Sequence, residues 1–312
     1  MKSYQRYVDE NKRVEGLYRV ITSGCEPRAA IGYSISSLFA SHVRSIVSLI
    51  RNYPGELLYI LKAKCGLFKF KAFCQGKSAL LIGNGPSQDS LTLEMLSEFQ
   101  TSGGETICVN YWHINKRLKK HVPNWLVLTD PISFTNKKFN NVGQSLEQYL
   151  QKNPNLKIIT TKYLHSQILD LKLENKCFLI LDQEALFTNW INPMLPRGYP
   201  SSTLYKALAC SLYLGYDYIG VIGMDNTYPR DIFSNKDNAV LNLERHAFEC
   251  DYINDRSNYY HNIASCLDQV LLSFIKLECF PVENIFNLDP YSLTDRFGKL
   301  TFEEFFRKIK SN

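Results

Sequence analysis

The chain has 312 residues, of which 45% are hydrophobic and 21% are charged. This composition excludes a disordered chain and predicts a globular protein of one large domain or two modest ones. Residues 1–77 hold 13 Lys and Arg against 5 Asp and Glu, so the formal charge of +6 belongs to the N-terminal segment. That segment is therefore the part expected to meet anionic lipid or another polyanion. We expect no nucleic-acid partner.

Cysteine usage and the absence of long apolar runs indicate a cytoplasmic protein. The nine cysteines are an odd number, and none forms a CxxC pair. We therefore expect reduced, buried thiols, with neither a disulfide framework nor a zinc site. Charged residues interrupt the first thirty positions, and no uncharged stretch reaches 18 residues. We expect neither a secretory leader nor a membrane-spanning helix.

The N-terminal segment has helical spacing with a basic, apolar surface. Apolar residues from Ile35 to Ile50 recur at helical intervals, and Pro54-Gly55 is expected to end that helix. Leucines and phenylalanines alternate with lysines from Glu56 to Phe73. Together these stretches predict a basic amphipathic helical hairpin. Its apolar stripe either packs on the body of the protein or a second subunit, or attaches residues 35–73 to an anionic inner membrane.

Strands and helices alternate after residue 77. The expected strands are 79–83, 106–110, 124–130, 156–161, 176–182 and 218–225, and the expected helices are 91–99, 146–152, 202–216 and 263–278. This alternation predicts an α/β fold with a doubly wound, mostly parallel sheet. We therefore divide the chain into a helical appendage at 1–76 and a nucleotide-binding catalytic body at 77–312.

The first strand runs into a glycine-rich loop, Gly83-Asn84-Gly85-Pro86-Ser87. A loop of this kind presents backbone amides at the mouth of an α/β sheet, often to a phosphate. The loop is neither the GxGxxG fingerprint nor a Walker A motif. A plain tight turn is the alternative. The Asn84 amide favours a ligand, because it can both donate and accept hydrogen bonds.

Polar residues also end later strands. Asn110 follows the second strand, Thr129-Asp130 the third, and Asp225 the strand from 218. Because the carboxyl ends of parallel strands share one edge, these residues are expected to border a single ligand crevice. Each of them alone could instead cap a helix or a turn.

His261 is the candidate general base among six histidines. It follows a polar, aromatic segment, DRSNYYHN, before the last long predicted helix. Histidine is the usual acid or base near neutral pH, although a lone histidine is more often structural. No HExxH motif or His-Cys cluster is present, so no metal site is expected.

The ordered set of motifs resembles the bacterial sialyltransferases of glycosyltransferase family 42 and related capsule and lipooligosaccharide glycosyltransferases. The shared elements are the GNGPS loop, a Ser/Thr turn before a helix ending in LGY, a strand ending in Gly-x-Asp, and a histidine after tyrosines. The tail DPYSLTDRF (289–297) also looks like the closing segment of that family. The resemblance covers residues 77–300 and implies a sialyltransferase variant of the GT-A-like fold.

The resemblance assigns roles to particular residues. The donor would be a CMP-activated acidic sugar, sialic acid or Kdo-like, held by the first loop, Asn110 and the turn at Ser201, Ser202 and Thr203. His261 would deprotonate the acceptor hydroxyl. The family places an aromatic residue and a tyrosine directly after its aspartate, whereas here Asn226 and Thr227 intervene. Tyr228, with Tyr259 or Tyr260, would then hold the phosphate, and Arg197 lies one residue out of register with a basic position of the family.

These expectations amount to an inverting glycosyltransferase without cofactor or metal, acting on a bacterial surface glycan or glycolipid acceptor. A CMP leaving group carries one phosphate, which amides and hydroxyls can neutralise. A rival class has a very similar loop, the MptE-like pterin diphosphokinases, which use ATP and magnesium. A third alternative is a non-catalytic, membrane-associated binding protein with the same fold. The expected location is cytoplasmic, with peripheral attachment to the inner membrane as the alternative to a free or homo-oligomeric state.

Overall fold

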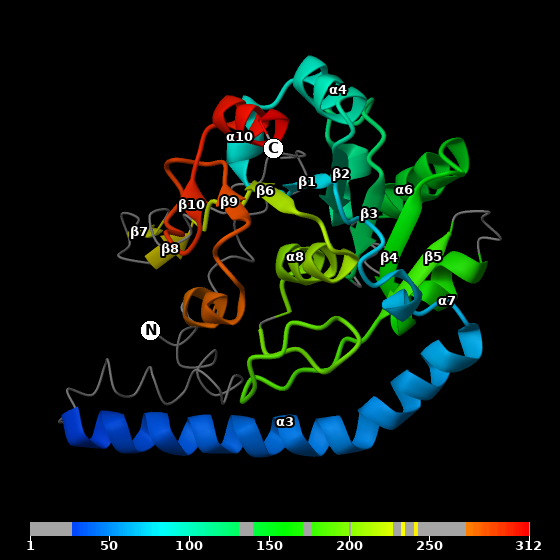
Figure 1. Ribbon diagram of the computed structural model, residues 1–312. Coiled ribbons are helices and arrows are strands. Elements are labelled where there is room, and N and C mark those ends of the chain that lie inside the picture. The colour runs from blue at the N-terminus through cyan, green and yellow to red at the C-terminus, as the bar shows by residue number, and fades with distance from the viewer. Residues whose placement is uncertain are drawn as a thin grey trace.

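The computed structural model describes residues 27–130, 140–170, 176–199, 201–226, 232–234, 240–242 and 273–311. Its centre is an eight-stranded sheet with the order β10-β9-β6-β1-β2-β3-β4-β5, which crosses the middle of Figure 1. The strands are β1 (Ser78–Ile82), β2 (Glu105–Val109), β3 (Trp125–Leu128), β4 (Lys157–Thr161), β5 (Cys177–Ile180), β6 (Tyr218–Ile222), β9 (Ile285–Asn287) and β10 (Gly298–Lys299). All seven pairings in this sheet are parallel. The predicted doubly wound α/β fold is confirmed.

Helices cover both faces of the sheet (Figure 1). They are α4 (Leu93–Thr101), α6 (Asn140–Lys152), α7 (Lys162–Asp170), α8 (Thr203–Leu214) and α10 (Phe302–Lys310). One face packs against α8, and the other against α4, α6, α7 and α10. The central strands are buried on both faces, which explains why their sequences read as continuous apolar runs. A separate two-stranded antiparallel sheet joins β7 (Ile232–Ser234) to β8 (Val240–Asn242).

The N-terminal segment forms one long helix, so the predicted helical hairpin is wrong. Helix α3 (Pro27–Ala63) runs for 37 residues and contains Pro54 in its interior. A proline inside a helix removes one backbone hydrogen bond and bends the helix, but the helix can continue beyond it. Figure 1 shows α3 bending before its last turns. Among the described helices, none combines the length and the hydropathy that a bilayer-spanning segment requires.

The residues between α3 and β1 belong to the body of the protein. A 3₁₀ turn, η1 (Leu67–Phe70), follows α3, and Leu67 and Cys74 are fully buried in the main core. The Leu179 N–H donates to the Cys65 carbonyl at 2.8 Å, and the Cys74 N–H donates to the Leu214 carbonyl at 2.8 Å. The end of the predicted appendage, residues 65–74, therefore packs on the sheet and on α8.

Two further expectations concern the cysteines and the last long helix. The cysteines in the described part of the chain are free thiols: Cys65, Cys74, Cys108, Cys177, Cys210 and Cys279. Most of the helix predicted at 263–278 lies outside the described residues. Its last part is described as a helical turn at 273–276, which continues into η7 (Leu277–Cys279).

Candidate active site

The site expected from the sequence lies where the order in which the chain adds strands to the sheet reverses. From β1 the chain adds β2, β3, β4 and β5 on one side, then returns through α8 to place β6 on the other side of β1. The carboxyl ends of β1 and β6 therefore face a topological switch point, where open α/β sheets bind their ligands. We call this side of the sheet the carboxyl edge.

The glycines of the first loop allow it to pack directly on the end of β6. The Gly83 N–H donates to the Ile222 carbonyl at 2.7 Å, and the Gly85 N–H donates to the Gly223 carbonyl at 3.1 Å. A β-carbon on Gly83 would lie 2.6 Å from the Gly223 carbonyl oxygen, closer than real contacts allow. Gly223 also has a positive φ of 77°. Glycine is therefore needed at these positions mainly because the two backbone segments approach each other too closely for a side chain.

Ser87 and Asp225 connect the same two strand ends through side chains. The Asp225 carboxylate accepts the Ser87 N–H at Oδ1, 2.9 Å, and the Ser87 hydroxyl at Oδ2, 3.0 Å. The Gly223 N–H in turn donates to Ser87 Oγ at 2.9 Å. The backbone amides of Gly83, Gly85 and Ser87 therefore already have protein acceptors. Among the backbone amides of this loop, the Asn84 N–H has no hydrogen-bond acceptor in the described part of the chain.

The environment of Asp225 favours its neutral form. Burial raises the pKa of this carboxyl to about 6, the two Ser87 hydrogen bonds oppose the shift, and the nearby charge of Asp289 adds to it. Asp289 lies after β9, the strand paired with β6, and is also buried. Two carboxylates close together in a buried place disfavour simultaneous ionisation.

A second polar group joins the ends of β2 and β3 to the start of α8. The Asn110 side-chain amide donates to the Thr203 hydroxyl at 2.8 Å, and its oxygen accepts the Thr129 N–H at 3.2 Å. The hydroxyls of Thr129 and Thr203 are 2.8 Å apart. Asn110 adopts a positive φ of 40°, an uncommon conformation that asparagine tolerates better than most residues. Strand ends that are separate in sequence are thus held in one hydrogen-bonded group.

Helix α8 brings its N-terminus to this edge. It packs against β1, β2 and β3. Ser202 is its N-cap residue, but the Ser202 side chain makes no capping hydrogen bond, and Ser201 is exposed. The first amides of a helix have no partner within the helix, and the helix dipole favours an anion there. This N-terminus is the strongest anion-binding feature among the predicted site residues.

Asp130 is oriented toward the start of the turn after β2. The Tyr111 hydroxyl donates to Asp130 Oδ2 at 2.9 Å. Tyr111 belongs to the 3₁₀ turn η3 (Asn110–Ile114), which begins at Asn110. Asp130 therefore borders the same edge as the Asn110 group, as its position after β3 predicted.

The C-terminal tail closes the other side of the edge. Ser292 donates from its hydroxyl to the Met224 carbonyl at 2.7 Å, and the Leu293 N–H donates to the Asp225 carbonyl at 3.0 Å. The Asn226 amide donates to the Thr294 hydroxyl at 2.7 Å. Sequence reasoning noticed this tail but did not place it at the site. The signal was the run of polar residues that directly follows β9.

Four predicted site residues lie outside the described residues: His261, Tyr228, Tyr259 and Tyr260. Their roles as general base and phosphate ligands remain predictions. The described part of the predicted site consists of the first loop, Asn110, Asp130, the residues 201–203 and Asp225.

Arg197 forms a buried ion cluster below the first turns of α8. Its guanidinium contacts the Asp182 carboxylate at 3.1 Å and the Glu184 carboxylate at 2.5 Å. Lys206, on α8, reaches Asp182 at 2.5 Å. Arg197 and Lys206 are almost fully buried. Since both cations share acidic partners, the cluster positions α8 rather than offering a free cation to a ligand.

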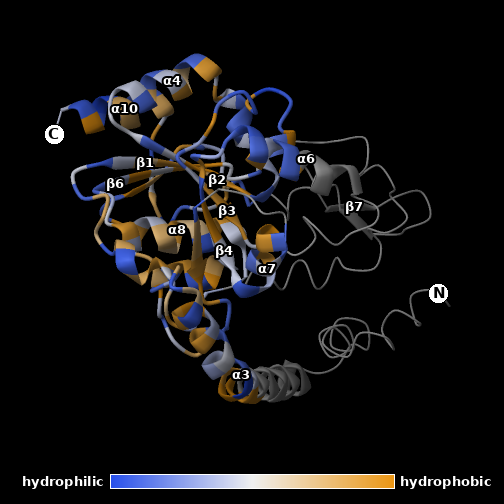
Figure 2. Ribbon diagram, turned by 90° about the vertical axis from the view of Figure 1, so that its right-hand side faces the viewer, coloured by the Kyte–Doolittle hydropathy of each residue, from blue (hydrophilic) through white to orange (hydrophobic). Residues whose placement is uncertain are grey.

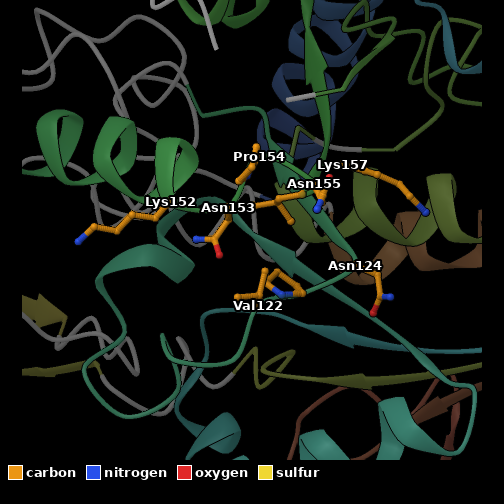
Figure 3. Close-up of a pocket in the computed structure, with 9 residues that line it drawn as sticks. Val122, Asn124, Lys152, Asn153, Pro154, Asn155 and Lys157 are labelled. Carbon is orange, nitrogen blue, oxygen red and sulfur yellow. The ribbon is translucent and has the colours of Figure 1, made fainter. Parts of the chain in front are cut away.

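A shallow recess of about 350 Å³ lies at the opposite edge of the sheet. Figure 3 shows residues that precede β3, such as Asn124, facing residues that precede β4, such as Asn155. Amino ends of parallel strands are not where α/β folds place their chemistry. The carboxyl edge is therefore the candidate site.

No known family model matches the sequence, and no curated protein matches it. Among solved structures, the chain is similar to the MAf glycosyltransferase from Magnetospirillum magneticum AMB-1, with a TM-score of 0.44 and 13% sequence identity. The similarity covers 76% of this chain and 37% of that chain. The chain thus spans well under half the length of that protein.

Proposed function

We propose that this protein is an inverting glycosyltransferase that takes an acidic sugar from a CMP-activated donor and transfers it to a hydroxyl of a bacterial surface glycan or glycolipid. The observation that supports this most is the meeting of the first loop, the Asn110 group and the N-terminus of α8 at the switch point of the sheet. This arrangement combines donors for one phosphate with amide and hydroxyl groups suited to a nucleoside.

In the proposed reaction the donor phosphate lies against the N-terminus of α8 and the Asn84 N–H. The acceptor oxygen attacks the anomeric carbon of the sugar from the face opposite the phosphate. The bond between that carbon and the phosphate oxygen breaks, and CMP leaves with the electron pair. His261 takes the proton of the acceptor hydroxyl. Fixed dipoles that already point at the leaving phosphate stabilise its developing charge.

A nucleotide screen tests this proposal. The melting temperature is measured with CMP, CDP, UDP, GDP and ATP, each with EDTA and with magnesium. A ligand at about 100 times its Kd adds about 2.7 kcal/mol to the stability of the folded state. We expect CMP and CDP to raise the melting temperature in EDTA. A rise in melting temperature that occurs only with ATP in the presence of magnesium would favour a pterin diphosphokinase instead.

Thr203→Val is the variant that tests the place of binding. Valine keeps the shape of threonine but removes the hydroxyl shared by Asn110 and Thr129. We expect the CMP-induced shift to fall strongly in this variant. The matched control is Thr106→Val, which removes a buried hydroxyl near the start of β2 that hydrogen-bonds to His121 at 2.9 Å. The control should lose stability and keep its response to CMP; equal responses in both variants would refute the proposed site.

His261→Ala tests the proposed base. A positioned base contributes about 10² to 10⁴ to a rate. We expect transfer to slow by that factor in a radiolabelled-donor assay, with the CMP-induced melting shift unchanged. A variant with the rate of the wild type would remove His261 from the mechanism, and a loss of the melting shift would make it a binding residue instead.

A further inference from the structure

The long helix α3 carries an apolar face that the body of the protein leaves exposed. At about 100° per residue, the exposed apolar residues fall within an arc of about 120°; they are Val43, Ile46, Val47, Ile50, Leu58 and Leu61. Ile50 is 72% exposed and Val47 58%. In Figure 2, α3 lies below the sheet, and its described turns include orange, apolar residues. We call these six residues the apolar face of α3.

The opposite side of α3 holds the helix on the body. Ile60 packs with Leu179 and Leu181, and the Glu56 carboxylate accepts the Asp182 N–H at 2.9 Å. The Tyr59 hydroxyl lies 3.0 Å from Nδ1 of His165, on α7. The apolar face therefore points away from the contacts that anchor the helix. Packing on the described body does not explain why this face is apolar.

The charges around this face have one sign. Five exposed basic residues lie beside it or in the segment that follows; they are Arg51, Lys62, Lys64, Lys69 and Lys71. From Val43 to Lys77 the only acidic residue is Glu56, and it is buried against Asp182 and Gln183. Phe68 is also exposed among these lysines. An apolar stripe bordered by cations, without an exposed carboxylate, is complementary to an anionic lipid surface.

We propose that α3 and the segment to Lys71 form a peripheral binding surface for an anionic lipid bilayer. The apolar face enters the boundary between headgroups and acyl chains, and the basic residues contact lipid phosphates. Asp182 lies two residues after the end of β5, the last strand on this side of the sheet, so α3 is anchored at the carboxyl edge. Bilayer binding would thus hold the candidate site near the membrane surface. The proposal does not depend on which reaction the site performs.

Sedimentation of the full-length protein with vesicles tests this proposal. Phosphatidylcholine vesicles are compared with vesicles that also contain phosphatidylglycerol. We expect binding to the anionic vesicles only, and a marked loss of binding between about 0.1 M and about 1 M salt, where the screening length falls from about 10 Å to about 3 Å. Equal binding to both vesicle types, or binding to neither, would overturn the proposal.

Two variants separate the apolar and the electrostatic parts. Val47→Glu should weaken vesicle binding about tenfold or more, because an apolar side chain that enters the bilayer is replaced by a charge. Val122→Glu is the matched control at the recess on the opposite edge, where Val122 is 41% exposed, and should bind as the wild type does. Lys69→Gln should weaken binding about fivefold.

The same variants distinguish a second copy of the chain from a membrane. If the face served an interface between two copies, the wild type would be a dimer in sedimentation velocity, and Val47→Glu would make it a monomer. That result would overturn the proposal. A wild-type protein whose mass matches one chain, together with salt-sensitive binding to anionic vesicles that Val47→Glu weakens, would support it.

Discussion

The Asp225 side chain is buried between the glycine-rich loop and the end of β6. The carboxylate accepts both the N–H and the hydroxyl of Ser87, and a β-carbon on Gly85 would lie 1.9 Å from its Oδ2. Asp225 therefore occupies the acceptor position that a phosphate takes on a free glycine-rich loop. In the proposed function, a donor phosphate would therefore use the neighbouring amides, above all those at the N-terminus of α8.

The titration of Asp225 gives a pH-dependent contribution to stability. The folded-state pKa of about 6 lies above the reference value of 3.8. A raised pKa means that the folded state holds this proton more tightly, so the contribution is complete below about pH 3.8 and is lost as the pH rises through about 6. The Asp225→Asn variant cannot ionise at this position. We therefore expect its free energy of unfolding in urea to rise relative to that of the wild type as the pH rises over this range.

The expected gain is on the order of 2 kcal/mol between pH 4 and pH 7. Asp295→Asn serves as the control, since Asp295 is a largely exposed carboxylate in an ion pair with Lys299. The difference between that variant and the wild type should change little over the same range. A wild-type minus Asp225→Asn difference that is flat with pH would show that Asp225 titrates normally.

At the scale of elements, α3 depends on a buried carboxylate for its attachment. Burial raises the pKa of Glu56, and the hydrogen bonds from Gln183 and from the Asp182 N–H oppose the shift. Glu56→Ala would leave the part-buried Asp182 N–H without its acceptor, which costs on the order of 1 kcal/mol. We expect that loss in urea unfolding, together with faster amide hydrogen exchange in the last turns of α3.

Glu303→Ala is the matched control for this attachment. Glu303 is an exposed glutamate on α10, and its removal should change the unfolding free energy little. Equal effects of the two substitutions would mean that the Glu56 contacts do not hold α3 on the body.

The same element shows a limit of local sequence rules. Pro54-Gly55 has the composition of a helix end, yet α3 continues to Ala63. Proline and glycine disfavour a helix by a few kcal/mol at most. The contacts of Tyr59 and Ile60 with α7 and the core after β5 lie beyond the proline, and packing of this kind can exceed a local penalty. A prediction of helix ends that uses only neighbouring residues in the sequence cannot include these tertiary contacts.

At the scale of the whole molecule, strand order decides what the site contains. Alternation of apolar strands and capped helices predicted the parallel sheet and each strand from β1 to β6 within a few residues. It did not predict that β9 would pair with β6 and bring Asp289 and Thr294 to the end of that strand. Pairing between strands more than 60 residues apart leaves no local trace in either strand.

Local sequence patterns were enough to predict the fold class, the glycine-rich loop after β1 and the polar residues at the ends of β2, β3 and β6. These features are local. The spacing of apolar residues along a segment reveals its secondary structure, and glycine marks positions that need a backbone conformation or a close approach that other residues do not allow. Three further features come from tertiary packing: Asp225 accepts the Ser87 N–H, Thr203 completes the Asn110 group, and the apolar face of α3 is turned away from the body. Each of these depends on distances between segments far apart in the chain, which packing of the whole sheet and its helices sets.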